Sequence, residues 1–437
     1  MPRRVGSPNA VVMADTVAVN DEVVLGTTGI LPMRVVVIRR LTAGRPTPPD
    51  NPLERVIPMP TTEQIIDVLR PVEDPELHRS IVDLGMVRTI TIDGGTVGVQ
   101  IALTVAGCPL RNEIQQRVTG AVATLDGVSD VRLDFTVMTD DERAAVREKL
   151  HGGAAQSQGH SHGHGHAEGR AVPFNEPGSR TRPILISSGK GGVGKSSVTV
   201  NLAVALAAQG HSVGVVDADI YGYSVPRMLG AERDPVVIDD MLVPPEAHGV
   251  RCISIGYFVP EGKAIVWRGP MLHKALEQFL ADVFWDDPDF LLIDMPPGTG
   301  DIALSLSTYL PRGEVYIVTT PQPAAQKVAR LSASMAETVK LPVKGVIENM
   351  SWFTGDDGKR YEIFGSGGGK ELAKDLGVPL LGQLPLVPAL REGGDTGRPI
   401  TVAQPDSEAA KAFHAIARQI AEDMKPRKKF LSALRVN

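Results

Sequence analysis

The chain has 437 residues, of which 42% are hydrophobic and 4% aromatic, and its formal net charge is −6. This length predicts roughly two to four domains, the aliphatic composition suits parallel sheets covered by helices, and the negative charge argues against nucleic acid as a partner. The two cysteines exclude a disulfide-rich secreted scaffold. Because no apolar run reaches the roughly 18 residues of a membrane span, we expect a cytoplasmic protein without one.

Residues 1–58 show no regular pattern. RPTPPDNP (45–52) is rich in proline, and VVVIRRL (35–41) is at most an isolated strand. Met59 directly precedes a helix start. We therefore predict that residues 1–58 are either a disordered leader or a mis-annotated one, with translation beginning near Met59.

Residues 59–145 have the pattern of a small α+β domain. Thr61 or Thr62 caps a helix with one apolar face, and alternating apolar residues on both sides of Asp93-Gly94-Gly95 predict a hairpin. Residues 109–125 follow as a helix and 128–137 as a strand.

Two segments outside the domains have biased composition. The predicted linker, 146–182, contains HGGAAQSQGHSHGHGHAEG (151–169), which cannot build a core. Its histidines either hold a metal or belong to a solvated spacer, and the spacer is the simpler interpretation. The tail, 426–437, is basic and is either solvated or bound to a membrane surface or partner.

Residues 183–425 alternate short apolar strands with helical stretches, which is typical of an α/β fold with a doubly wound, mostly parallel sheet. The predicted strands are ILISS, SVGVVDAD, DFLLIDMPP, EVYIVTT, VKGVIENM and PLLGQLP.

GKGGVGKSS (189–197) lies between the first of these strands and a helix, the context that confirms a phosphate-binding loop. We expect Lys195 to neutralise the β- and γ-phosphates of ATP and the Ser196 hydroxyl to ligate Mg²⁺. The helix N-terminus adds partial positive charge. The predicted nucleotide-binding residues in the loop are Gly189, Lys190, Gly191, Gly192, Val193, Gly194, Lys195, Ser196 and Ser197.

Carboxylates follow two further strands. Asp217 and Asp219 end VVDAD, and Asp294 ends LLID. Asp294 has the pattern of a Walker-B carboxylate that holds Mg²⁺, and Asp301 follows on a glycine-rich loop that can move when the γ-phosphate leaves. These side chains are expected beside the phosphates.

The second lysine of the loop, Lys190, is explained by a resemblance. GKGGVGKSS resembles the deviant Walker A motif of the MinD/ParA/nitrogenase-iron-protein class. The resemblance implies that Lys190 reaches the nucleotide of the other subunit of a homodimer, and that Asp219 orients the attacking water. Lys190, Lys195 and Asp219 are thus the expected catalytic residues.

Other stretches resemble the Mrp/ApbC family of iron–sulfur cluster carrier ATPases: DADIYGYSVPRMLG, VWRGPMLHKALEQFL, TTPQPAAQKVAR and GVIENMSWF. RPVEDPELHRSIVDLGMV and LTVAGCPL resemble the iron–sulfur-assembly domain that often precedes it. The resemblance implies an adenine contact for Asn349, a transient iron–sulfur cluster, and apo client proteins and assembly factors as partners.

The chain departs from this family at Thr354–Gly358, where the usual Cys-x-x-Cys pair is missing. Cys108 precedes Pro109 at an expected helix start, which favours a reactive thiolate and makes it the candidate cluster ligand. Cys252 lies in a predicted buried strand and is expected to be inert. Two alternatives remain: a MinD- or ParA-like positioning switch, suggested by the tail, and a metal carrier using the histidine tract.

Overall fold

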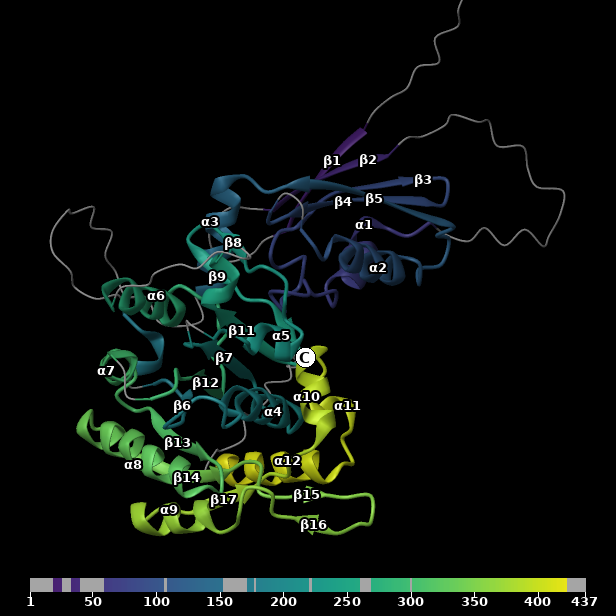
Figure 1. Ribbon diagram of the computed structural model, residues 1–437. Helices are drawn as coiled ribbons and strands as arrows, with labels where there is room; N and C mark the ends of the chain where they lie inside the picture. The colour runs from purple at the N-terminus through teal and green to yellow at the C-terminus, as the bar shows by residue number, and fades with distance from the viewer. Residues whose placement is uncertain are drawn as a thin grey trace, which may run out of the picture. The chain divides into compact units, whose positions relative to one another are not determined.

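The computed structural model describes residues 59–105, 108–151, 171–176, 178–219, 222–259, 269–298 and 301–422, and two strands at 19–25 and 33–39. The chain divides into two compact units, Met1–His160 and Ser161–Asn437, whose elements are labelled in Figure 1. In the described part of the chain, no helix combines the length and apolar character needed to cross a membrane. The tail, 426–437, and the histidine tract beyond residue 151 lie outside the described residues.

The first unit contains a five-stranded sheet with the order β1-β2-β3-β4-β5. The outer pair β1–β2 and the central pair β3–β4 are antiparallel, while β2–β3 and β4–β5 are parallel. The strands are β1 Val19–Leu25, β2 Met33–Arg39, β3 Val87–Asp93, β4 Thr96–Leu103 and β5 Asp130–Val137. The helices are α1 Thr62–Leu69, α2 Arg111–Val122 and α3 Asp140–His151.

Local sequence signals explain the elements of this unit that were predicted. Thr61 is the N-cap of α1, and its side chain and that of Gln64 each accept a hydrogen bond from the other's backbone N–H, which completes a capping box. Gly94 and Gly95 form the β3–β4 turn with φ of 50° and 93°, in the left-handed region that favours glycine. The predicted hairpin, helices and strand are confirmed.

The first unit differs from the sequence analysis in three places. The run expected to be at most an isolated strand is β2, which pairs with β1 and β3, so residues 1–58 contribute two strands to the sheet. Helix α2 begins at Arg111 rather than 109. Helix α3 was not predicted and continues beyond 145, where the linker was expected to begin. Strand pairing between distant segments leaves no local sequence signal, which is why the first difference was missed.

The second unit is an α/β domain with an eight-stranded sheet of order β10-β11-β7-β12-β6-β13-β14-β17. All neighbours are parallel except the edge pair β10–β11. The strands are β6 Arg182–Ser187, β7 Val213–Asp217, β10 Glu246–Ala247, β11 Val250–Ser254, β12 Phe290–Asp294, β13 Glu314–Thr319, β14 Val343–Glu348 and β17 Leu380–Gln383. The predicted doubly wound sheet and its six predicted strands are confirmed.

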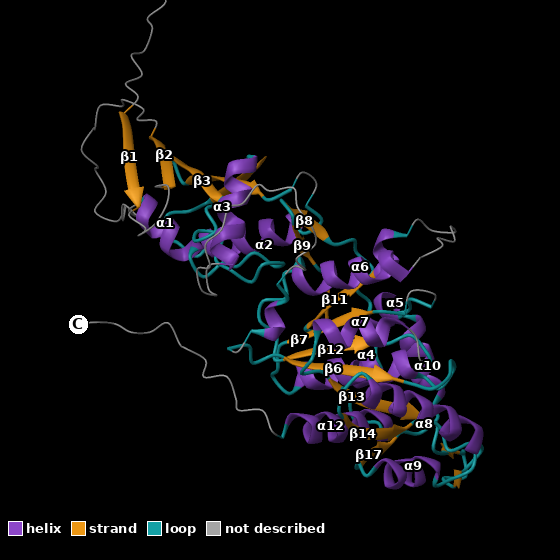
Figure 2. Cartoon of the chain, turned by 90° about the vertical axis from the view of Figure 1, so that its left-hand side faces the viewer, coloured by secondary structure: helices purple, strands orange, loops and turns teal. Residues whose placement is uncertain are grey.

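Helices cover both faces of this sheet, as Figure 2 shows. One hydrophobic core cluster joins alternate strand residues to α6 Gly269–Ala281, α7 Asp301–Tyr309, α8 Pro323–Thr338 and α9 Gly368–Leu376. The opposite cluster joins the intervening strand residues to α4 Lys195–Ala208, α5 Val225–Leu229, α11 Ile400–Ala403 and α12 Glu408–Ala421. Helix α10, Pro388–Asp395, precedes α11. Because both faces are covered, the strands are apolar without alternation.

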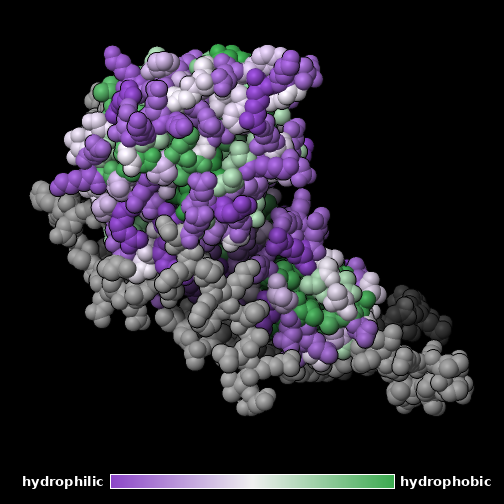
Figure 3. Space-filling view, turned by 90° about the horizontal axis from the view of Figure 1, so that it is seen from below, coloured by the Kyte–Doolittle hydropathy of each residue, from purple (hydrophilic) through white to green (hydrophobic). Residues whose placement is uncertain are grey.

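Several short elements were not predicted from the sequence. They are the hairpin β8 Val236–Ile238 with β9 Met241–Val243, the hairpin β15 Phe353–Thr354 with β16 Arg360–Tyr361, and the 3₁₀ turns η1 Pro173–Asn175 and η2 Ile255–Phe258. Val172 and Phe174 are buried in the core of the second unit, although residues 146–182 were predicted to be linker. On the face seen in Figure 3, hydrophilic residues predominate and hydrophobic ones form limited patches between them.

Candidate nucleotide site

The glycine loop connects β6, at the centre of the sheet, to α4. Strand order reverses here: β12 and β7 lie on one side of β6, and β13 and β14 on the other, so the loop lies at a topological switch point. Gly192 and Gly194 have φ of 81° and 82°, which suits glycine, and α4 begins directly afterwards. A Cβ on Gly189 would lie 2.2 Å from the backbone carbon of Val328 in α8, so only glycine fits there. The loop backbone and the N-terminus of α4 therefore border the same site.

Lys195 is 6% exposed and lies between two carboxylates from different strands. Its Nζ atom is 2.7 Å from Asp294 Oδ2 and 3.8 Å from Asp219 Oδ2. The structure thus brings together Asp294 at the end of β12, Asp219 just beyond β7, and Lys195 of the loop. A lysine head in this position can neutralise phosphate charge beside the helix N-terminus.

Asp294 also accepts hydrogen bonds from two hydroxyls of α4. Ser196 Oγ donates to Asp294 Oδ2 at 2.6 Å, and Thr199 Oγ1 donates to Asp294 Oδ1 at 2.7 Å. Hydroxyl and carboxylate oxygens are the donors that Mg²⁺ prefers. The donor set of Ser196 and Asp294 therefore fits the predicted magnesium site, with Thr199 fixing the orientation of the carboxylate. Thr199 was missed in the sequence, although it lies one helical turn after Lys195.

Asp217 is fully buried at the end of β7 and organises the wall of the site. It accepts hydrogen bonds from the backbone N–H groups of Asp219, Ser224 and Val225 and from Ser254 Oγ. Burial, followed by the neighbouring charge of Asp294, raises the pKa of Asp217 from 3.8 to about 7. The sequence placed this residue beside the phosphates but did not reveal its hydrogen-bond partners, because Ser254 comes from a segment that is distant in the chain.

Lys190 is partly exposed, and its Nζ atom lies 3.4 Å from Gln322 Oε1. Among the described residues, no carboxylate lies within ion-pair distance of it. The two lysines of the loop are thus in different environments: Lys195 is paired within its own chain, whereas Lys190 makes one contact with a neutral amide.

Asn349 lies at the end of β14 and is 2% exposed. Its side-chain amide donates to the carbonyl of Val193 at 2.9 Å, and a Cβ on Gly194 would lie 2.3 Å from the same nitrogen. The structure therefore places Asn349 against the glycine loop. Its adenine contact, implied by the resemblance, stays a prediction.

A cavity of about 170 Å³ opens where these elements meet. Its lining includes seven loop residues of the predicted set: Lys190, Gly191, Gly192, Gly194, Lys195, Ser196 and Ser197. Asp219 also lines it, whereas Gly189 and Val193 do not. Four lining residues were not predicted: Ser188, Ser224, Met228 and Pro297. Ser188 and Pro297 flank predicted motifs, and Ser224 and Met228 lie within DADIYGYSVPRMLG, so all four could have been found by proximity to the quoted stretches.

The two cysteines form no disulfide bond and are buried in different units. Cys252 is fully buried in β11, hydrogen-bonds with Tyr257, and has its pKa raised chiefly by burial, which agrees with an inert core thiol. Cys108 is 8% exposed and lies in the turn before α2, where its carbonyl accepts from Arg111 N at 3.2 Å. No group of three or more potential metal ligands occurs among the described residues.

The segment that departs from the expected Cys-x-x-Cys pattern forms the β15–β16 hairpin. Asp357 in its turn accepts hydrogen bonds from Lys359 N and the Tyr361 hydroxyl, and these lower the pKa of Asp357. Arg360 stacks on the Trp352 ring at 4.3 Å. A polar turn, stabilised by the hydrogen bonds of Asp357, therefore occupies this position.

Comparison with known protein families identifies the family of the domain that carries this site. A model described as the NUBPL iron-transfer P-loop NTPase matches residues 180–421, more than half of the chain. The chain belongs to this family. A second model, described as an iron-sulfur cluster assembly protein, matches residues 62–134 in the first unit. The NUBPL-type NTPase domain thus coincides with the α/β unit that carries the nucleotide site.

Relatives of this NUBPL-type NTPase match most of the chain. The iron-sulfur cluster carrier protein of Mycobacterium bovis is 48% identical over 351 residues, covering 79% of this chain and 89% of its own length. The protein of that name in Synechocystis sp. is 43% identical over 371 residues, covering 83% and 98%. Among solved structures, a nucleotide-binding protein from Archaeoglobus fulgidus in complex with ADP is 34% identical, covers 54% of this chain and 93% of its own, and has a TM-score of 0.46.

Proposed function

We propose that this protein is an ATP-hydrolysing iron–sulfur cluster carrier that acts as a cytoplasmic homodimer and transfers clusters to apo client proteins. The observation that carries the ATPase part is the convergence of Lys195 and Ser196 on Asp294 at the carboxyl edge of a parallel sheet. A glycine loop, a buried lysine and an oxygen-only donor pair at one helix N-terminus suit a nucleoside triphosphate with its metal ion.

Each residue has a distinct role in this proposal. The loop N–H groups and Lys195 bind and orient the β- and γ-phosphates. Ser196 and Asp294 would hold Mg²⁺, which would supply neutralisation of phosphate charge. Asp219, 3.8 Å from Lys195, orients the attacking water through its carboxylate. Asp217 keeps the following loop and the start of α5 in place through its backbone hydrogen bonds.

The environment of Lys190 supports the homodimer. An in-trans cation must be able to leave its own protomer, and a single 3.4 Å contact with Gln322 opposes this little. In the dimer, Lys190 would stabilise charge that develops on the partner's nucleotide, as arginine fingers do. Hydrolysis would then depend on dimer formation.

The cargo is supported by the relatives' name, iron-sulfur cluster carrier protein, and by the assembly-protein match in the first unit. Clusters are held by several cysteine thiolates, whereas each described unit has a single buried cysteine. We infer that a cluster is held transiently, with Cys108 as this chain's ligand and the remaining ligands supplied by a second protomer, a client or a small thiol. The tail that suggested a positioning switch lies outside the described residues, so no structural observation favours that alternative.

Anaerobic reconstitution tests the proposal. The full chain, incubated with iron and sulfide, is expected to gain iron and visible absorbance, and to activate an apo-ferredoxin faster with ATP than without it. Lys195→Ala should lose the ATP effect and keep the iron. If the parent chain neither takes up iron nor activates the acceptor, the carrier function is wrong even if the ATPase is present.

A further inference from the structure

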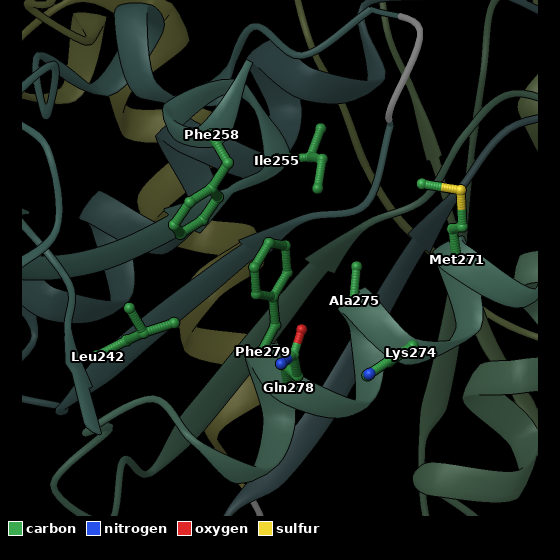
Figure 4. A pocket seen from close by; sticks show the side chains of 8 residues that line it. All are labelled: Leu242, Ile255, Phe258, Met271, Lys274, Ala275, Gln278 and Phe279. Carbon is green, nitrogen blue, oxygen red and sulfur yellow. The ribbon is translucent and has the colours of Figure 1, made fainter. Parts of the chain in front are cut away.

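A second cavity, of about 450 Å³, lies in the second unit away from the phosphate loop. None of its lining residues lines the nucleotide cavity. Figure 4 shows its lining: Leu242, Ile255, Phe258, Met271, Lys274, Ala275, Gln278 and Phe279. Five of these come from α6, two from η2 and one from β9. Because none of these residues lines the nucleotide cavity, we consider a separate role for this second cavity.

Helix α6 presents two different faces. Leu276 and Leu280 are buried in the core, whereas Met271, Lys274 and Gln278 follow one another at intervals of three and four residues on the cavity side. Among the described residues, no other element covers this second stripe: Met271 is 46% exposed, and Lys274 is exposed. One stripe of the helix is therefore available to a partner.

The wall facing this stripe is aromatic. The rings of Phe258 and Phe279 are stacked with their centroids 5.9 Å apart, and Phe258 is 45% exposed although it is not at a chain end. Partly exposed Phe and Met side chains around a concave apolar surface are typical of protein-binding sites, where such residues dominate the binding energy. The cavity thus suits an apolar anchor side chain better than a polar metabolite.

Lys274 supplies the charge at the rim. Among the described residues it has no ion-pair or hydrogen-bond partner, and it is the only ionisable side chain in the cavity lining. Glu277, three residues after Lys274 on the same helix, does not line the cavity, and its charge contributes to raising the pKa of Tyr309 in α7. Gln278 adds an amide that can pair with a peptide backbone. The rim is therefore complementary to an anionic, hydrogen-bonding partner.

We propose that this surface, formed by η2 and the α6 stripe, docks a partner protein through an amphipathic acidic segment: an apolar side chain enters the cavity, and a neighbouring Asp or Glu pairs with Lys274. The surface is connected to the nucleotide site. His273 of α6 hydrogen-bonds Ser305 of α7 at 3.0 Å, and Ile255 follows Ser254, which holds Asp217. A docked partner is thereby placed where the proposed ATPase cycle can act on it.

The test uses the full-length chain and a short fluorescein-labelled helical peptide with Leu and Phe on one face and flanking glutamates. Fluorescence polarisation should show saturable binding. Phe258→Ala should weaken it about 30-fold, the effect of losing a buried aromatic anchor. Lys274→Glu should weaken it about tenfold by replacing attraction with repulsion, and a peptide with lysines in place of the glutamates should bind Lys274→Glu better than the parent.

Lys411→Glu is the matched control, because Lys411 is an exposed helix lysine outside the cavity. Met271→Glu changes a surface-exposed residue of the cavity and should also weaken binding. It keeps the proposal testable if Phe258→Ala fails to fold. Equal affinity of the parent, Lys274→Glu and Met271→Glu would overturn the proposal. Binding of dodecanoate with no binding of either peptide would overturn it in favour of a lipid acyl chain.

Discussion

The phosphate loop and the Cys108 turn differ in how much of a site one chain assembles. Around the loop, the end of β12 and the start of α4 bring Lys195 and Ser196 into hydrogen bonds with Asp294, and the end of β7 places Asp217 where it interacts electrostatically with Asp294. Around Cys108 there is one buried thiol and, among the described residues, no group of potential metal ligands. The nucleotide chemistry is thus largely built into the protomer, whereas the proposed cargo chemistry requires ligands from elsewhere.

The largest expected effect concerns the nucleotide site, which a single chain largely assembles. Lys195→Ala should lower ATP hydrolysis by about 10³-fold or more, because it removes the buried cation that neutralises the transferred phosphate. Phosphate release under saturating ATP and Mg²⁺ measures it, with Lys411→Ala as a control for an exposed lysine. Hydrolysis at the parent rate would remove the assignment of this site.

Lys190→Ala tests the one part of the nucleotide chemistry that one protomer is expected to lack. We expect turnover to fall by about 10³-fold while nucleotide affinity changes only a few-fold, because an in-trans cation acts mainly in the transition state. Stopped-flow nucleotide binding and steady-state turnover separate the two quantities.

Mixing Lys190→Ala with Asp219→Ala sharpens this test. A heterodimer has one composite site with both residues intact, so partial activity should return. Absence of any recovery, with heterodimers demonstrated by native mass spectrometry, would show that Lys190 acts in cis or has no catalytic role.

At the Cys108 turn, where one chain supplies a single thiol, Cys108→Ala should remove most of the iron that the parent gains on anaerobic reconstitution, because clusters need thiolate ligands. Cys252→Ala is the matched control, since Cys252 is fully buried in β11 and should contribute no ligand. Deletion of 151–169 should also leave most of the iron. Equal iron in Cys108→Ala and the parent would leave a carrier with other ligands, or an ATPase with another cargo.

The smallest expected effect concerns Asp217 and pH. Its pKa is raised from 3.8 to about 7, so between these values the native state holds a proton that the unfolded state releases. The stability from this group is therefore present below pH 3.8 and lost as pH rises through about 7. Asp217→Asn cannot titrate, so its deficit in the free energy of unfolding relative to the parent should shrink between about pH 5 and about pH 8.

Urea denaturation at both pH values measures this difference. Asp406→Asn, at an exposed carboxylate on the surface, serves as the control substitution. A deficit for Asp217→Asn that grows with rising pH would contradict the predicted direction of the shift.

Short-range signals made much of the fold predictable. The Thr61 capping box, the Gly94-Gly95 turn and the apolar strands depend on residues within a few positions of one another. The glycine loop was predictable for the same reason, because strand, loop and helix are contiguous. The pairing of β1 with β2 was not predictable, because the residues between these two strands lack the Asn-Gly or Asp-Gly signals of short turns. The β15–β16 turn contains such a signal, Asp357-Gly358, which the sequence analysis overlooked.

The sequence by itself determined the local chemistry of this protein: a phosphate-binding loop with two lysines, carboxylates at strand ends, and two cysteines too few for a cluster within one chain. The tertiary structure alone decided which of these groups meet. The parallel order β7-β12-β6 buries Asp217 and sets it in register beside Asp294, and burial, followed by the charge of Asp294, raises the pKa of Asp217. It also leaves one stripe of α6 uncovered beside Phe258. Such proximities follow from strand order and helix packing, which join residues that are far apart in the chain.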